Sequence, residues 1–198
     1  MFFGHAGADF SEYYASGVLK DITQLIKDNG TYDRIESGYY GPYTVDDKIY
    51  GYPEAVLTPW QSLYVNRDIF DACGITEDPT TVDELIATCN TIRENGYDPI
   101  AIGDKDGWPA VILCGDYYAQ QTADYGELNK ILTGEDTFPG NEVFRNAFAT
   151  VVELGQNGAY MSGFSSTDHN TAIQAFAAGQ TAMLANGPWM IGDFSDTS

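Results

Sequence analysis

Apolar residues recur at helical spacing in several segments of the chain. The clearest case begins at Thr81, which forms a capping box with Glu84 three residues later, and it ends at Gly96. Its apolar face consists of Val82, Leu85, Ile86, Cys89 and Ile92. We expect further helices over residues 9–20, broken at Gly17, and over residues 68–73, 108–118, 142–154 and 170–178. The helix over 142–154 has a broad apolar face that includes Phe148 and Val152.

Short strands are predicted between these helices. Residues 60–66 alternate, so that Trp60, Ser62, Tyr64 and Asn66 share one strand face. We also expect a turn leading into a short strand over residues 45–51, a short buried strand over 99–103 and a strand over 181–186. Because helices and strands alternate along the chain, the pattern predicts an α/β fold.

Charge and composition exclude some classes of partner. The 198-residue chain has a net charge of −20, which repels nucleic acid and anionic membrane surfaces. Aromatic residues make up 14% of the chain, a fraction too high for an acidic disordered segment. We therefore expect a folded domain whose acidity serves mainly its solubility.

Metal and nucleophile motifs are weak throughout the sequence. The three cysteines have no CxxC spacing, so we interpret them as buried thiols rather than disulfide or zinc ligands. The run from Asp104 to Gly107 fails as a calcium loop, because Ile102 and Leu113 would occupy ligand positions. The chain contains no GxSxG elbow and no phosphate-binding glycine loop, and its two histidines fall in predicted loops. We expect no cofactor and no metal.

Paired carboxylates leave a catalytic alternative open. Two of them could serve as the acid and the base or nucleophile of glycoside hydrolysis, with Glu54, Asp104 and Asp106 as candidates. Among 29 acidic residues some pair will always lie close together, so this pattern selects no particular site.

Each of the three tryptophans lies where the chain changes direction. Trp60 follows a Thr-Pro pair, Trp108 follows Asp-Gly, and Trp189 follows Gly-Pro. An aromatic ring beside a turn can pack into the core, or it can offer a flat apolar face to a sugar ring while polar neighbours bind the hydroxyls. The residues alone leave both interpretations open.

The order of motifs along the chain resembles one protein family. The matching segments are FFGHAGADFSEYYASGVLKDIT, DDKIYGYPEAVLTPWQSLYVNRDIFDACGI, PTTVDELIATCNTIRENGYDPIAIGDKDGWPA and AIQAFAAGQTAMLANGPWMIGDF. Together they are similar to the extracellular solute-binding proteins of family 1. These are the sugar-binding components of ABC importers related to maltose-binding protein.

The resemblance implies a periplasmic-binding-protein type II-like α/β fold, with two lobes that close on a ligand by a hinge movement. Residues 1–53 would be a remnant of the first lobe, 54–62 the hinge crossover, and 63–198 a second lobe truncated at its C-terminal end. Family members are about twice as long, so we expect an incomplete fold: part of the first lobe and most of the second. Such an internal piece would bind sugar weakly or not at all, and its uncovered apolar surface would favour self-association.

The family's ligand-contacting positions carry over to this sequence one at a time. They match the loop before the first helix, the crossover, the loop before the helix at Trp108, and the NGPW turn. The candidate ligand-binding residues are therefore His5, Asp9, Glu54, Trp60, Asp106, Trp108, Asn186 and Trp189.

The resemblance also implies partners and a location. We expect an oligosaccharide ligand, importer permease subunits as protein partners, and a periplasmic or lipid-anchored extracellular parent protein. The expected function is binding without catalysis. The alternatives are a glycoside-acting enzyme with paired carboxylates, or a peptide- or cation-binding relative of the same transporter class.

Overall fold

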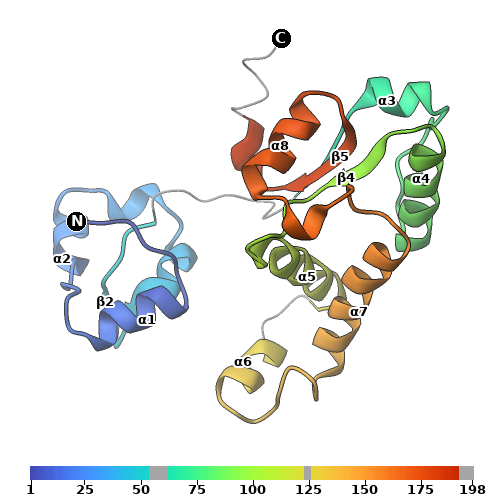
Figure 1. Cartoon of the computed structure of the whole chain (residues 1–198). Coiled ribbons are helices and arrows are strands. Elements are labelled where there is room, and N and C mark those ends of the chain that lie inside the picture. Colours follow the sequence, from blue (N-terminus) through green and yellow to red (C-terminus); the bar gives the residue numbers. More distant parts are fainter. Residues whose placement is uncertain (54–61, 123–125, 192–198) are drawn as a thin grey trace. The chain divides into compact units, whose positions relative to one another are not determined.

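A computed structural model describes residues 1–53, 62–122 and 126–191. The chain divides into two compact units, Met1–Val56 and Leu57–Ser198, and each is described by itself (Figure 1). The predicted crossover over residues 54–62 lies almost entirely outside the described residues, as do two of the candidate binding residues, Glu54 and Trp60.

The first unit consists of short elements joined by tight turns. They are α1 (Ala8–Ala15), α2 (Thr23–Asp28), the 3₁₀ helices η1 (Tyr32–Arg34) and η2 (Ser37–Tyr43), and strands β1 (Thr44–Val45) and β2 (Lys48–Ile49). The strands pair antiparallel across Asp46 and Asp47, whose φ angles of 50° and 61° are those of a type I′ hairpin turn. The expected helix break holds, because α1 ends just before Gly17, which has a φ of 73°.

The core of the first unit is small and rich in tyrosine. Its buried apolar residues are Ile26, Tyr40 and Ile49. The Tyr40 ring stacks on Tyr32 with ring centroids 5.0 Å apart, and its hydroxyl donates to the Tyr32 carbonyl oxygen at 3.2 Å. None of the eight residues of α1 is buried. Aromatic stacking therefore supplies much of the packing in this unit.

The second unit is built around a three-stranded sheet in the order β3-β5-β4. Strand β5 pairs antiparallel with β3 and parallel with β4. The elements are β3 (Ser62–Val65), α3 (Arg67–Ala72), α4 (Val82–Glu94), β4 (Asp98–Ala101), α5 (Trp108–Gln121), α6 (Gly126–Leu132), α7 (Glu142–Gln156), the 3₁₀ helix η3 (Phe164–Ser166), α8 (His169–Ala177), β5 (Thr181–Asn186) and the 3₁₀ helix η4 (Pro188–Met190).

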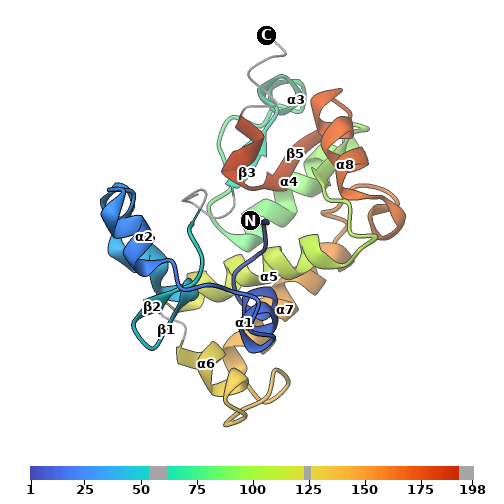
Figure 2. The same cartoon turned by 90° about the vertical axis from the view of Figure 1, so that its left-hand side faces the viewer.

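Helices cover both faces of this sheet. Helix α4 lies on one side of β4 and β5 and α8 lies on the other, and α5 runs alongside α7 (Figures 1 and 2). Met183 packs into the larger core together with Phe70 and Ile92, whereas its neighbour Leu184 packs against Ala172 of α8. A strand covered on both faces reads as a continuous apolar run, which is why TAMLAN is apolar along most of its length.

Local sequence signals fixed several elements correctly. The capping box of Thr81 and Glu84 is present, with both reciprocal hydrogen bonds, and it opens α4. The expected helix over residues 142–154 extends to Gln156, but Phe148 and Val152, which we placed on its apolar face, are exposed. Helix α5 packs on one stripe of α7, and that stripe is narrower than the apolar face of the sequence.

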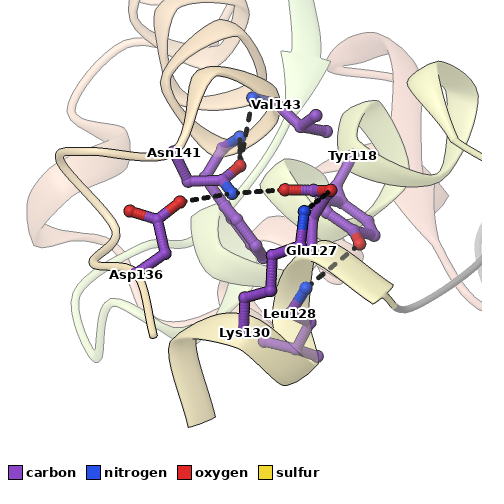
Figure 3. Close-up of polar contacts among 8 residues, drawn as sticks. Tyr118, Glu127, Leu128, Lys130, Asp136, Asn141 and Val143 are labelled. Carbon is purple, nitrogen blue, oxygen red and sulfur yellow. Dashed lines mark hydrogen bonds and ion pairs between the residues drawn. The ribbon is translucent and has the colours of Figure 1, made fainter. Parts of the chain in front are cut away.

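Helix α6 has no strong signal in the sequence and is held in place by polar contacts. The buried Asn141 side chain donates to Glu127 Oε2 at 2.8 Å and to Asp136 Oδ2 at 3.0 Å, and its own oxygen caps α7 at Val143 N (Figure 3). Glu127 in turn accepts from Lys130 Nζ at 2.6 Å. Because every polar atom of the Asn141 side chain is used, this network ties α6 and the following loop to the start of α7.

Two of the three cysteines are buried thiols, as expected, and Cys73 is not fully buried. All three are free; Cys89 and Cys114 are buried and Cys73 is half-buried. Desolvation raises the pKa of Cys89 to about 12, although Arg93 opposes this shift. The thiol therefore stays protonated at neutral pH and is a poor nucleophile. Within the described part of the chain, no helix is long and apolar enough to cross a bilayer, and no group of three metal-ligating side chains forms.

Candidate functional site

The candidate site lies where two parallel strands end. Strands β4 and β5 run in the same direction, with Ala101 opposite Leu184, so their carboxyl ends reach the same edge of the sheet. The loop that leads to Trp108 follows β4, and the NGPW turn follows β5 from Asn186. Ligands of α/β proteins commonly bind beyond the carboxyl ends of such strands.

The loop after β4 packs closely against the start of α8. A Cβ atom on Gly103 would lie 2.3 Å from the Asp168 carbonyl oxygen and 2.8 Å from the His169 backbone nitrogen, so only glycine permits this approach. Backbone hydrogen bonds continue the contact, with Asp104 N donating to Phe164 O at 2.9 Å and Lys105 N donating to Thr167 O at 3.1 Å. The loop and the N-terminus of α8 therefore form one rigid corner.

Trp108 is the first residue of α5, and its position is set by the residues before it. Gly107 takes a left-handed conformation, with a φ of 77°, that turns the chain into the helix. Asp104 Oδ1 accepts from Ala110 N at 3.0 Å and so satisfies a free amide of the first turn. The Trp108 side chain is left 40% exposed, and Asp106 is exposed in the preceding turn.

His169 lies directly against Trp108. It is the first residue of α8, whose N-cap is Asp168, with its carboxylate accepting from Thr171 N at 3.0 Å. The imidazole and indole ring centroids are 4.4 Å apart, with the planes tilted by 59°. The half-buried imidazole therefore supports one side of the Trp108 ring.

Asn186 connects this corner to the NGPW turn. It is only 2% exposed. Its side-chain oxygen accepts from Gly187 N at 2.8 Å, and its Nδ2 lies 3.4 Å from His169 Nε2. The last residue of β5 is thus bonded on one side to the turn and on the other to α8.

The NGPW turn positions the ring of Trp189. A Cβ atom on Gly187 would lie 2.0 Å from Cζ3 of Trp189, so the indole lies directly over the glycine backbone. The Gly187 carbonyl oxygen accepts from the Tyr64 hydroxyl at 2.9 Å, which ties the turn to β3. The Trp189 side chain is 39% exposed. Trp108, His169, Asn186, Gly187 and Trp189 therefore form one continuous series of contacts.

Burial and hydrogen bonds shift the pKa values of three side chains near this site, His169, Tyr64 and Asp168. Partial burial lowers the pKa of His169 below 6.5, and the negative charge of Asp168 opposes this shift only in part. Burial raises the pKa of Tyr64, and hydrogen bonds from Thr171 lower the pKa of Asp168. At neutral pH the His169 imidazole and the Tyr64 phenol are therefore neutral, and the Asp168 carboxylate, which caps α8, is ionised.

The eight candidate residues fall into three groups. Trp108, Asn186 and Trp189 come together, with Asp106 in the turn before Trp108. His5 and Asp9 are exposed residues of the first unit, and Glu54 and Trp60 lie outside the described residues. Neither Trp108 nor Trp189 is buried in a core, which is the condition that a platform for a ligand must meet.

Sequence reasoning missed His169 and Tyr64. From the sequence, both histidines are expected in loops, which is wrong for His169, because it is the first residue of α8 and follows the N-cap Asp168. Tyr64 appeared only as one residue on a strand face. The only sequence signal for His169 is its place at the start of a predicted helix, and its contact with Trp108 joins residues 61 positions apart.

Comparison with known proteins identifies the family. The sequence model of the family described as "Bacterial extracellular solute-binding protein" matches residues 3–197. The chain belongs to this family. One solved structure similar to this solute-binding protein comes from work on xylan utilization by the thermophilic bacterium Caldanaerobius polysaccharolyticus. It has a TM-score of 0.84 and 28% identity, and the match covers 98% of this chain and 48% of the other.

Two further relatives agree with this assignment. A solved chitin oligosaccharide binding protein has a TM-score of 0.84 and 26% identity, over 97% of this chain and 46% of the other. An uncharacterized ABC transporter extracellular-binding protein of Pyrococcus horikoshii is 30% identical over 143 residues, which are 67% of this chain and 29% of the relative. The expected α/β solute-binding fold is confirmed, and the chain spans about half the length of these solved structures. The extracellular family implies a periplasmic or extracellular location.

Proposed function

We propose that this chain is part of a carbohydrate-binding component of an ABC-type importer, and that Trp108 and Trp189 are the platforms on which sugar rings lie. The observation that carries the proposal is the joined series of contacts from Trp108 through His169 and Asn186 to Trp189, which holds two half-exposed indoles at the carboxyl ends of parallel strands. Indole faces match the weakly apolar faces of sugar rings.

The polar groups around these rings suit sugar hydroxyls. Asp106 is exposed beside Trp108, and the Trp108 and Trp189 rings carry indole N–H donors. In this proposal Asn186 mainly supports the platforms rather than contacting the sugar, because it is buried and its amide is engaged by Gly187 and His169. His5, Asp9, Glu54 and Trp60 remain further candidates for the same ligand.

The proposed activity is binding without catalysis. Glycoside hydrolysis needs two carboxyl groups free to face one glycosidic bond. Of the three carboxylates in the loop after β4 and at the start of α8, Asp104 and Asp168 are engaged as caps of α5 and α8, which leaves Asp106, exposed beside Trp108. Two relatives are described as binding proteins, one for chitin oligosaccharide and one in an ABC transporter, which supports the same choice. Docking to importer permeases and lipid anchoring of the parent protein are part of the proposal.

Titration of xylotetraose and chitotriose, followed by NMR, tests the function. The chain has three tryptophans, so its indole N–H groups give three separate signals. From the sequence, we expect the chain by itself to bind sugar weakly or not at all. The present proposal requires weak binding, so a method that registers weak complexes is used. Sugar should shift the Trp108 and Trp189 signals together and in a saturable way.

Two outcomes would contradict the proposal. Indole signals that stay in place with every oligosaccharide tested would remove the platforms from the site. Shortened oligosaccharides after incubation with the chain would favour the glycoside-acting enzyme instead.

A further inference from the structure

We propose that His169 is a positioning residue of this site, whose neutral imidazole holds Trp108 and Asn186 in the binding arrangement, so that protonation of His169 weakens sugar binding. The proposal rests on the proposed function for its effect on affinity. The coupling of these three side chains can be tested without any sugar.

The hydrogen bonds of Asn186 fix which imidazole nitrogen carries the proton. Asn186 Oδ1 accepts from Gly187 N at 2.8 Å, so a flip of the amide would place its NH₂ group against a backbone donor. The Asn186 Nδ2 donor must therefore face His169 Nε2, 3.4 Å away. In that arrangement Nε2 is the acceptor and the proton of the neutral ring lies on Nδ1.

Protonation would turn this contact into a repulsive one. A charged imidazole has a proton on both nitrogens, so Nε2–H would face the Nδ2–H₂ group of Asn186. Asn186 is 2% exposed and cannot turn its amide to solvent, so the imidazole has to move. Because the imidazole lies 4.4 Å from the Trp108 ring, its movement would also shift that platform.

The charged groups around His169 come from its own helix and from the loop after β4. Asp168 precedes it in the chain and favours the charged ring, whereas partial burial favours the neutral ring and outweighs it. Asp104 and Lys105 lie on the loop packed against the start of α8, and Asp106 follows them. Since burial lowers the pKa of His169 below 6.5, the arrangement is intact at neutral pH and is lost as the pH falls through that lowered value.

The first experiment uses NMR of the imidazole nitrogens and requires no ligand. His5→Gln leaves His169 as the single histidine, which assigns its signals. At pH 7.5 we expect a proton on Nδ1 and none on Nε2. On acidification, the Asn186 side-chain amide and the Trp108 indole signals should shift with the same midpoint as the imidazole. A proton on Nε2 at pH 7.5, or indole and amide signals that ignore the midpoint, would overturn the proposal.

The second experiment measures xylotetraose affinity between pH 7.5 and pH 5. The unsubstituted chain should lose affinity about tenfold across the His169 titration, the scale expected when a buried donor loses its acceptor. His169→Gln retains an acceptor for Asn186 and cannot titrate, so its affinity should be independent of pH in this window. His169→Phe retains a ring beside Trp108 but no acceptor, so its affinity should be low at both pH values.

The outcomes of the two experiments separate the proposals. An identical pH profile in the unsubstituted chain and His169→Gln would refute the role of His169 while leaving sugar binding in place. If no oligosaccharide binds at any pH, the proposed function fails, and the NMR experiment alone decides whether His169 couples Trp108 to Asn186.

Discussion

The two units of the chain hold their candidate residues in different ways. In the first unit, His5 precedes α1 and Asp9 lies in it, and no residue of this helix is buried. The core of this unit has three buried apolar residues. In the second unit, Trp108, Asn186 and Trp189 are fixed by a glycine contact, two helix caps and the amide of Asn186. Among the candidates that the structure describes, those of the second unit are the ones already positioned, and pre-organised groups bind with less loss of entropy.

This difference follows from the amount of core beneath each set of residues. The second unit covers both faces of a sheet, so the ends of its strands are fixed by packing from two sides. The first unit has a two-stranded hairpin and stacked tyrosines, which constrain its loops less. A recognition site that must stay rigid without its ligand is therefore expected in the second unit.

The largest expected effect is a core substitution that separates the stabilities of the two units. Phe70 is completely buried in the main core of the second unit, so Phe70→Ala should lower the free energy of unfolding of that unit by about 4 kcal/mol. Hydrogen exchange should show faster exchange at Met183 and Leu184 and unchanged exchange at Ile26 and Ile49. Equal acceleration in both units would mean that they unfold as one.

A pair of glycine substitutions tests the rigid corner itself. In Gly103→Ala the new methyl group meets the Asp168 backbone, and we expect a loss of about 2 to 3 kcal/mol together with displaced His169 signals. Gly115 lies inside α5 with open space around it, so Gly115→Ala should stabilise the unit by about 0.5 to 1 kcal/mol. Thermal unfolding measures both. If Gly103→Ala were as well tolerated as Gly115→Ala, the close packing of this corner would be wrong.

Substitution of one equally exposed aromatic residue in each unit tests whether sugar binds at the second unit. Trp189 of the second unit and Tyr39 of the first are both 39% exposed. Trp189→Ala should weaken oligosaccharide binding by about 2 kcal/mol, the scale of an aromatic hot spot, whereas Tyr39→Ala should leave the affinity unchanged. NMR titration with xylotetraose measures the affinity of both variants. Equal losses of affinity would contradict the proposal that the sugar platform lies in the second unit.

The smallest expected effect concerns a half-buried acid on α5. Desolvation raises the pKa of Asp116 to about 6, so the folded state binds more protons than the unfolded state between about pH 4 and pH 6. The stability of the second unit should therefore fall as the pH rises through this window. Asp116→Asn should remove that fall and raise the free energy of unfolding at pH 7 by about 1 kcal/mol.

A matched acid on α7 provides the control for this effect. Glu153 is exposed, and Glu153→Gln should change stability by less than about 0.5 kcal/mol. Denaturant unfolding at pH 4, 6 and 7 makes the comparison. Parallel pH profiles for Asp116→Asn and the unsubstituted chain would show that Asp116 is ionised without penalty.

Helices and strands that depend on neighbouring residues can be predicted from the sequence. The capping box at Thr81 and Glu84, the alternation before Asn66 and the strand over residues 181–186 each depend on residues within a few positions of one another. Among the described residues, each formed as predicted. The tryptophans were found as candidates for the same reason, since a turn beside an aromatic residue is visible in the chain itself. Where a prediction needed a partner from another element it failed, as for Phe148 and Val152 on α7.

The contacts between these residues arise from the packing of elements that are distant in the sequence. The parallel pairing of β4 and β5 brings residue 108 next to residue 169 and residue 169 next to residue 186, and no local pattern encodes those distances. The hydrogen bond from Gly187 N orients the Asn186 side-chain amide, and this amide in turn makes Nε2 the acceptor nitrogen of His169. Periodicity in a sequence shows which side of a helix or strand is apolar. A binding site consists of contacts between elements. These contacts form only when the strands have paired and the helices have packed on both faces of the sheet.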